Sequence, residues 1–153
     1  MQDKPATSVE TPAPVAILGC GLIGISWTAL FLHHGIDVHA WDPNPDVRNS
    51  LAERVKPPMA QLLQMAAPAR VLGHLSLCPE MPKALEDVAF VQENAHEVVA
   101  VKHEIYQIFE RYAASDALIA SSASGLSWSA LSAGMQAPER LLTAHPFNPP
   151  QLV

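Results

Sequence analysis

The chain has 153 residues, of which 49% are hydrophobic and 16% are charged. This composition supports one packed domain and excludes an intrinsically disordered chain. Nine lysines and arginines against fifteen aspartates and glutamates give a net charge of -6, which argues against a protein that binds the phosphate backbone of a nucleic acid. Two cysteines, Cys20 and Cys78, are too few for a disulfide scaffold and are typical of a reducing compartment.

Residues 15–32 carry no charge and approach the minimum length of a transmembrane helix. Three glycines within this stretch, and the His-His-Gly sequence at 33–35 that follows it, do not fit a membrane anchor. Asp3 and Glu10 precede it and no small-residue cleavage pattern follows, so it is not typical of a signal peptide. We therefore expect a cytoplasmic protein without membrane attachment.

Residues 1–13 are polar and contain proline, so we expect a flexible leader followed by a domain over residues 14–153. Within the domain, short apolar runs bounded by turn residues alternate with segments of helical periodicity. The clearest helix covers residues 97–113, and we expect its apolar stripe from Val98 to Tyr112 to lie in the core. The expected strands are residues 15–18, 37–41, 75–78, 88–91, 118–120 and 141–144, and the expected helices are residues 22–34, 46–55, 59–65, 97–113 and 127–133.

Strands that alternate with helices at this spacing predict a parallel sheet with helices on both faces. The expected fold class is therefore α/β, a Rossmann-type, doubly wound and mostly parallel sheet. Pro57 and Pro58 should interrupt the helical segment that follows the second strand.

The hexapeptide Gly-Cys-Gly-Leu-Ile-Gly follows the first expected strand and opens the first expected helix, which is the context of a dinucleotide-binding loop. Gly19 permits the tight turn, Gly21 lets the backbone approach a pyrophosphate, and Gly24 lets helix and strand pack closely. The free N–H groups around Leu22 and Ile23 and the helix dipole would hold the phosphate charge. The motif thus predicts a nucleotide cofactor.

Asp42 ends the second expected strand, 18 residues after Gly24, where a carboxylate bonds the ribose hydroxyls of NAD. It would repel the extra phosphate of NADP, and no arginine adjoins it before Arg48. The sequence therefore favours NAD over NADP. The alternative interpretation is a glycine turn in which Asp42 only caps a loop.

Two polar clusters follow later strands, Ser-Ala-Ser-Gly-Leu at 122–126 and His-Pro-Phe-Asn-Pro-Pro at 145–150. His145 can take a hydroxyl proton while the carbon releases hydride to a nicotinamide, and Ser124 can hydrogen-bond the same hydroxyl. The alternatives are a loop histidine bonded to backbone and a serine that caps a helix. The remaining histidines show no metal-ligand spacing, so we expect no metal site.

Four segments occur together in one order: the glycine loop, Phe-Val-Gln-Glu-Asn at 90–94, Ser-Ala-Ser-Gly-Leu at 122–126 and His-Pro-Phe-Asn-Pro at 145–149. In this set the chain resembles the NAD-binding domain of the L-3-hydroxyacyl-CoA dehydrogenase superfamily. The resemblance extends from residue 15 to the end of the chain.

The resemblance implies that His145 is the catalytic base and that Ser124 contacts both substrate and cofactor. It also implies that Glu93, Lys102 and Asn148 line the NAD site. The chain departs from the family at residue 123, where alanine replaces the usual threonine.

The spelling His-Pro-Phe-Asn-Pro is more similar to the branch of carnitine 3-dehydrogenase and lambda-crystallin (gulonate 3-dehydrogenase) than to the β-oxidation enzymes, which usually show His-Phe-Phe-Asn-Pro. The nine-residue step from Glu93 to Lys102 indicates the same branch. The helices after Asp42 carry few basic residues for a CoA phosphate. These features favour a small free 3-hydroxy acid over an acyl-CoA as the substrate.

Members of this superfamily continue into a helical second domain that closes the substrate cleft and forms a homodimer, and they carry a glutamate that orients the histidine. We therefore expect the chain to be the cofactor domain of a longer enzyme, inactive alone, which oxidises a 3-hydroxyl to a ketone with NAD. Two other interpretations stay open: a stand-alone NAD-binding module without turnover, and a different Rossmann enzyme.

Overall fold

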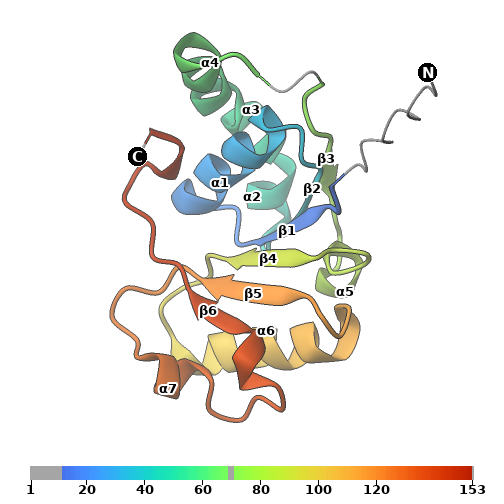
Figure 1. Cartoon of the computed structure of the whole chain (residues 1–153), viewed down its shortest axis with the longest axis vertical. Helices are drawn as coiled ribbons and strands as arrows, with labels where there is room; N and C mark the ends of the chain where they lie inside the picture. The colour runs from blue at the N-terminus through green and yellow to red at the C-terminus, as the bar shows by residue number, and fades with distance from the viewer. Residues whose placement is uncertain (1–11, 69–70, 153) are drawn as a thin grey trace, which may run out of the picture.

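The structure, a computed structural model, describes residues 12–68 and 71–152, so residues 1–11 of the expected leader lie outside it. Six strands form one parallel sheet in the order β3-β2-β1-β4-β5-β6 (Figure 1). This is the strand order of the doubly wound dinucleotide-binding fold, and the expected fold class is confirmed. The strands are β1 (Val15–Leu18), β2 (Val38–Trp41), β3 (Leu75–Leu77), β4 (Phe90–Glu93), β5 (Leu118–Ser121) and β6 (Leu141–Thr143).

The central strand β1 is apolar throughout because both of its faces are covered. Val15 and Ile17 pack into the core on the side of α1 (Leu22–His33), whereas Ala16 and Leu18 pack into the core on the side of α6 (Val99–Tyr112). All four side chains are buried. A strand buried on both faces needs no alternation of polar and apolar residues.

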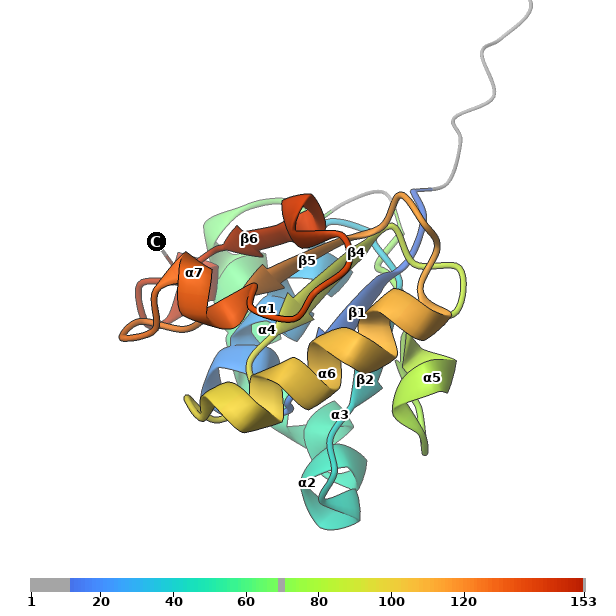
Figure 2. The ribbon, with the colours of Figure 1, turned by 90° about the horizontal axis from the view of Figure 1, so that it is seen from below.

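Helix α1 lies between the sheet and α4 (Lys56–Met65), while α6 runs along the opposite face (Figure 2). This sandwiched position explains why residues 15–32 carry no charge. Gly35, just past the end of α1, has φ 75°, the conformation expected of a glycine that ends a helix. Across residues 12–68 and 71–152, no helix has both the length and the apolar character needed to cross a bilayer.

Strand β4 begins two residues later than the apolar run at 88–91 predicts. Its backbone pairs with β1 only from Phe90 onward, and Val88 is a buried residue of the preceding loop. The strand therefore extends through Gln92 and Glu93, whose polar side chains are fully buried. Buried polar residues of this kind break the pattern on which the prediction rests.

The helical segment after β2 also differs from the expectation. It divides into α2 (Pro45–Asn49), α3 (Leu51–Arg54) and α4. The expected interruption lies slightly earlier than predicted: α3 ends at Arg54, and Pro57 and Pro58 lie in the first turn of α4, which begins at Lys56. The N–H groups of a first turn have no intrahelical acceptor, so proline is tolerated there.

The second half of the chain completes the sheet. After β6, residues 144–152 run along the carboxyl edge of the sheet towards α1 and end in the short η2 turn (Pro150–Leu152) (Figure 1). The remaining elements are α5 (Met81–Ala84), α7 (Trp128–Leu131) and η1 (Pro138–Arg140).

We predict that Gly24→Ala destabilises the fold. A Cβ at Gly24 would lie 2.0 Å from the carbonyl oxygen of Gly19, so α1 would have to move away from the end of β1. Such overpacking lowers the free energy of unfolding by about 1–3 kcal/mol or more, which urea denaturation measures. Gly21→Ala is the control, because a Cβ there meets nothing within 4 Å. Equal unfolding midpoints for the two variants would contradict this account.

Candidate functional site

The glycine loop places the start of α1 at the carboxyl edge of the sheet. Gly19 has φ 95°, and a Cβ there would lie 2.8 Å from the carbonyl oxygen of Asn94. Gly21 is the N-cap of α1, no side chain caps this helix start, and its first turn carries no acidic residue. Leu22 in that turn is 63% exposed. The uncapped N–H groups and the positive end of the helix dipole suit an anion such as a pyrophosphate.

A cavity of about 820 Å³ opens beside this loop, within the range of small-molecule sites. One wall contains Gly21 and Asp42, and the other contains Val101, Ile105 and Ile108 of α6. The cavity therefore joins a carboxylate and open backbone to an apolar surface. This combination fits a ribose and a flat base.

The cavity corrects the expectation that the whole apolar stripe of α6 lies in the core. Val98, Val101 and Tyr112 are exposed, while Lys102 and Tyr106 are buried in their place. The face of α6 that packs on the sheet is rotated relative to the apolar stripe. Part of the stripe lines the cavity instead. A surface that binds a ligand needs apolar side chains just as a core does, so the sequence pattern is the same in both cases.

Asp42 ties the glycine loop to the end of β2. Its Oδ2 accepts from the backbone N–H of Cys20 at 2.8 Å, and its Oδ1 accepts from the N–H of Asn44 at 2.9 Å. Each carboxylate oxygen accepts more than one donor, so this loop-capping role and a ribose contact are compatible. Arg48 lies closer than the sequence suggests, since its Nη1 donates to the main-chain carbonyl of Asp42 at 3.3 Å. Burial, with the charge of Asp42, raises the pKa of Cys20 to about 12, so this thiol stays protonated at neutral pH.

Glu93 and Lys102, which the resemblance places at the NAD site, are fully buried and are not among the residues that line this cavity. Lys102 Nζ donates to the Oε1 and Oε2 atoms of Glu93 at 2.7 and 2.8 Å. The carboxylate also accepts from Ser121 Oγ at 2.7 Å, Tyr106 OH at 3.1 Å and the N–H of Ala95 at 2.6 Å. This satisfied pair joins β4, β5 and α6 behind the loops of the site.

Tyr106 and Ser121 are members of the buried pair's hydrogen-bond network that sequence reasoning missed. Burial, together with the nearby charge of Glu93, raises the pKa of Tyr106, so its hydroxyl stays protonated and donates. The signal that could have found it is the spacing, because Lys102 and Tyr106 lie four residues apart on one face of a helix.

Ser124 lies in the exposed loop after β5, and its hydroxyl donates to Glu97 Oε1 at 2.9 Å. The same oxygen accepts from the N–H groups of Ser124 and Gly125. These backbone hydrogen bonds hold the pKa of Glu97 below its usual value. Ser124 is not a helix cap, because Ser127 fills that role for α7 by accepting from the N–H of Ala130. Sequence reasoning missed Glu97, which lies within the nine-residue step from Glu93 to Lys102.

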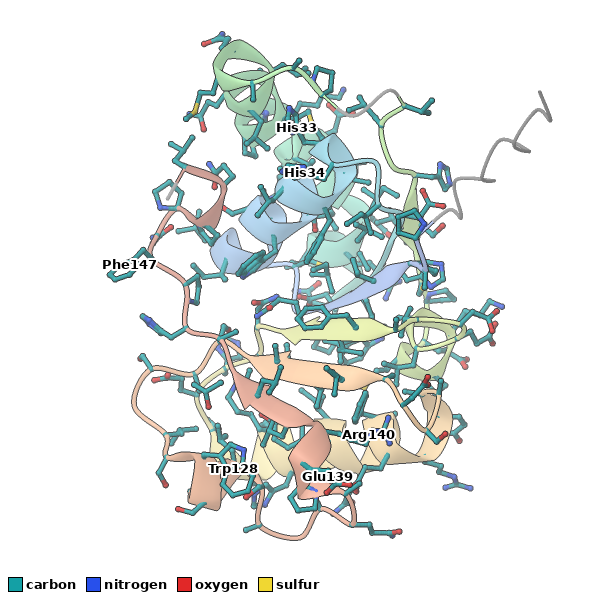
Figure 3. The ribbon with its side chains drawn as sticks, viewed as in Figure 1. His33, His34, Trp128, Glu139, Arg140 and Phe147 are labelled. Carbon is teal, nitrogen blue, oxygen red and sulfur yellow. The ribbon has the colours of Figure 1, made fainter. Side chains whose placement is uncertain are left out.

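His145 follows β6, the neighbour of β5, so His145 and Ser124 stand at the same carboxyl edge of the sheet. His145 is exposed and lines a second cavity of about 250 Å³ together with Trp27 of α1 and Phe147. Figure 3 shows Phe147 projecting outward from the segment after β6, and 79% of it is exposed. Asn148 is exposed and precedes Pro149 through a cis peptide bond. In residues 12–68 and 71–152, no cluster of three or more His, Cys, Asp or Glu side chains could hold a metal.

The strand order, the glycine loop and the acid at the end of β2 define a Rossmann-type NAD-binding domain. Residues 14–153 match the family model described as 3-hydroxyacyl-CoA dehydrogenase, NAD binding domain, and the chain belongs to this family. The expected superfamily and the expected cofactor, NAD, are thereby confirmed.

Sequence relatives include L-carnitine dehydrogenases from several bacteria. The chain is 36% identical to that of Nocardiopsis dassonvillei over 100% of this chain and 47% of the relative. It is 41% identical to that of Burkholderia mallei over 96% of this chain and 45% of the relative. The chain spans about half the length of the curated relatives it matches.

Similar solved structures carry the same fold. A 5-dehydrogenase of the pyridine carboxylic acid FHMPC, an NAD+ dependent dismutase, has a TM-score of 0.81 at 24% identity and covers 93% of this chain and 47% of that one. A diketoreductase has a TM-score of 0.79 at 23% identity, covering 93% of this chain and 53% of that one. At these identities the likeness establishes the fold alone.

Proposed function

We propose that this NAD-binding domain serves a dehydrogenase that oxidises the 3-hydroxyl of a 3-hydroxy acid or 3-hydroxyacyl-CoA to a ketone. The observation that carries the proposal is the place of His145. It follows β6 at the carboxyl edge of the sheet and shares a cavity with Trp27 of α1, the helix that begins at the glycine loop. A titratable base thus borders the helix whose N-terminus suits the pyrophosphate.

The residues of the cavity divide the binding of NAD between them. The uncapped start of α1 holds the pyrophosphate, Asp42 accepts from ribose hydroxyls, and the apolar wall of α6 packs against the adenine. The buried pair of Glu93 and Lys102 stabilises the loops behind this site. When bound, NAD supplies the acceptor for the hydride.

The proton is handled by the chain's own side chains. The imidazole of His145 takes the proton of the 3-hydroxyl as its carbon loses hydride, and Ser124 hydrogen-bonds the same oxygen. Both residues extend from the ends of neighbouring strands, so the sheet sets their relative positions. Asn148, three residues after His145, lies on the same exposed segment and would approach the nicotinamide half of the cofactor.

The substrate we propose is a small free 3-hydroxy acid, such as carnitine or gulonate. The relatives named L-carnitine dehydrogenase support this choice. The basic residues after Asp42 support it too, because they are already engaged. Arg48 donates to the carbonyls of Asp42 and Pro79, Arg54 donates to the carbonyl of Cys20, and Lys56 pairs with Glu53. A CoA phosphate would have to replace these partners.

A reducing compartment, the cytoplasm, is the location we propose. Cys20 and Cys78 are both free and buried, which fits a cell interior where thiols stay reduced.

The chain should bind NADH more tightly than NADPH, because the carboxylate of Asp42 accepts ribose hydroxyls and repels a phosphate. Fluorescence titration with each reduced cofactor measures this difference. Gly21→Val should abolish binding, since its methyl groups would occupy the open space at the start of α1, where Gly21 has nothing within 4 Å of a Cβ. Unchanged circular dichroism of the variant is the control for folding. Equal affinity for both cofactors would contradict the role of Asp42 as the acceptor of the ribose hydroxyls.

In the full-length protein, His145→Gln should lower kcat by roughly a hundred- to ten-thousand-fold, because it removes the general base. The dissociation constant for NADH should stay nearly unchanged, since His145 does not line the larger cavity. Steady-state kinetics and cofactor titration on the same preparation separate the two effects. A variant that keeps its kcat would show that the base lies elsewhere.

The full-length protein should give a higher kcat/KM with a free 3-hydroxy acid than with a 3-hydroxyacyl-CoA. Carnitine, gulonate and 3-hydroxybutyryl-CoA, each assayed by NADH formation, provide the comparison. A higher kcat/KM for the acyl-CoA would reverse the choice of substrate and leave the reaction type in place.

A further inference from the structure

The loop between β4 and α6 carries a carboxylate that reaches the loop after β5. Glu97 Oε1 accepts from Ser124 Oγ at 2.9 Å, from the N–H of Gly125 at 3.1 Å and from the N–H of Ser124. Three donors of one loop therefore converge on one oxygen from a distant part of the chain.

We propose that Glu97 is a positioning residue of the dehydrogenase, whose carboxylate holds the backbone of Ser124 and Gly125 so that the Ser124 hydroxyl faces the substrate. The inference rests on the proposed function, in which Ser124 bonds the oxygen of the 3-hydroxyl. Glu97 itself touches neither the substrate nor the cofactor in this role.

The loop after β5 is anchored at two points, and Glu97 supplies the outer one. At its base, the N–H and Oγ of Ser122 donate to the carbonyl of Glu93 at 2.9 and 3.0 Å. At its tip, Ser124 and Gly125 are exposed, so without Glu97 their N–H groups would turn to water. An exposed serine has several rotamers of similar energy, and a fixed backbone reduces the entropy lost when it binds a substrate.

The segment that presents Glu97 is held by buried contacts at its base. The buried pair of Glu93 and Lys102 closes its two ends, and the N–H of Ala95 donates to Glu93 inside it. The nine-residue step between the paired residues thus forms a loop with a fixed base and Glu97 near its tip. The carboxylate of Glu97 is ionised at neutral pH, the form that accepts all three hydrogen bonds, and the hydrogen bonds from Ser124 and Gly125 lower its pKa further.

The three hydrogen bonds have different tasks. The two backbone N–H groups hold the loop in place whether or not a substrate is present. The hydroxyl of Ser124 can exchange Glu97 for the substrate oxygen by rotating about its own bond, because the backbone bonds remain. Glu97 therefore anchors the loop, and it also accepts the hydrogen bond of the Ser124 hydroxyl when no substrate is bound.

The test compares Glu97→Ala with a matched control in the full-length protein. Glu97→Ala should lower kcat by up to about a hundredfold, the cost of misplacing a contact residue by 1 Å, with the KM for NAD unchanged. Glu97→Gln keeps an acceptor oxygen and should recover most of the loss. Glu110→Ala is the control, because Glu110 Oε1 likewise accepts two loop N–H groups, those of Gln136 and Ala137, both at 2.8 Å. It should leave kcat unchanged.

A double-mutant cycle shows whether Glu97 acts through Ser124. If it does, Ser124→Ala with Glu97→Ala should lose no more kcat than Ser124→Ala alone. Amide exchange measured by NMR on the 153-residue chain should show faster exchange at Ser124 and Gly125 in Glu97→Ala than in Glu110→Ala. Losses that add in full, or a Glu97→Ala variant with unchanged kcat while Ser124→Ala is impaired, would overturn the inference and leave the proposed function intact. An unimpaired Ser124→Ala would overturn the role of Ser124 and the inference together.

Discussion

The close approach of α1 to the end of β1 is the constraint on which the site depends. Gly24 has no side chain, so the helix can start directly over the carbonyl of Gly19. This contact places the helix N-terminus at the carboxyl edge of the sheet, where the loop after β4 also meets β1 through the hydrogen bond from Asn94 N to Leu18 O at 2.7 Å. A bulkier residue at position 24 would separate the helix from the sheet. The start of the helix, which suits an anion, would then move away from the glycine loop and from the loop after β4.

Carboxylates organise the loops around that edge. Asp42 accepts from the loop after β1, Glu93 from the loop after β4, and Glu97 from the loop after β5. A binding site for a pyrophosphate tolerates so many acids because each one is already bonded to backbone N–H groups or, for Glu93, to Lys102. The negative charges of these carboxylates are therefore partly neutralised by hydrogen bonds within the loops. The uncapped start of α1 remains free to attract an anion.

The sequence pattern predicted the structure correctly where the conformation depends on neighbouring residues alone. The glycine loop, β1 and the C-terminal end of α1 each follow from backbone sterics and an apolar run, and the structure agrees with them. The offset of β4 could not be predicted, because Gln92 and Glu93 are polar residues that are buried in a strand between β1 and β5, which lie far away in sequence. Periodicity also identified the apolar stripe of α6 without showing that Val101 faces a cavity rather than the core. Glu97 escaped notice for the same reason, since its partners lie 27 residues further along the chain.

The part of the site that suits the cofactor is more preorganised than the part around His145 and Ser124. This difference bears separately on the affinity for NAD and on the rate of the chemical step. The cofactor side has a formed cavity of about 820 Å³, and its loops are held by buried or half-buried hydrogen bonds. The proposed substrate side consists of exposed residues on the segment after β6, with a cavity of only about 250 Å³ beside His145. Binding of NAD therefore depends on groups that are already in place. In the function we propose, the chemical step would depend on how firmly the exposed Ser124 loop and the His145 segment are held. For the Ser124 loop, the structure provides the carboxylate of Glu97.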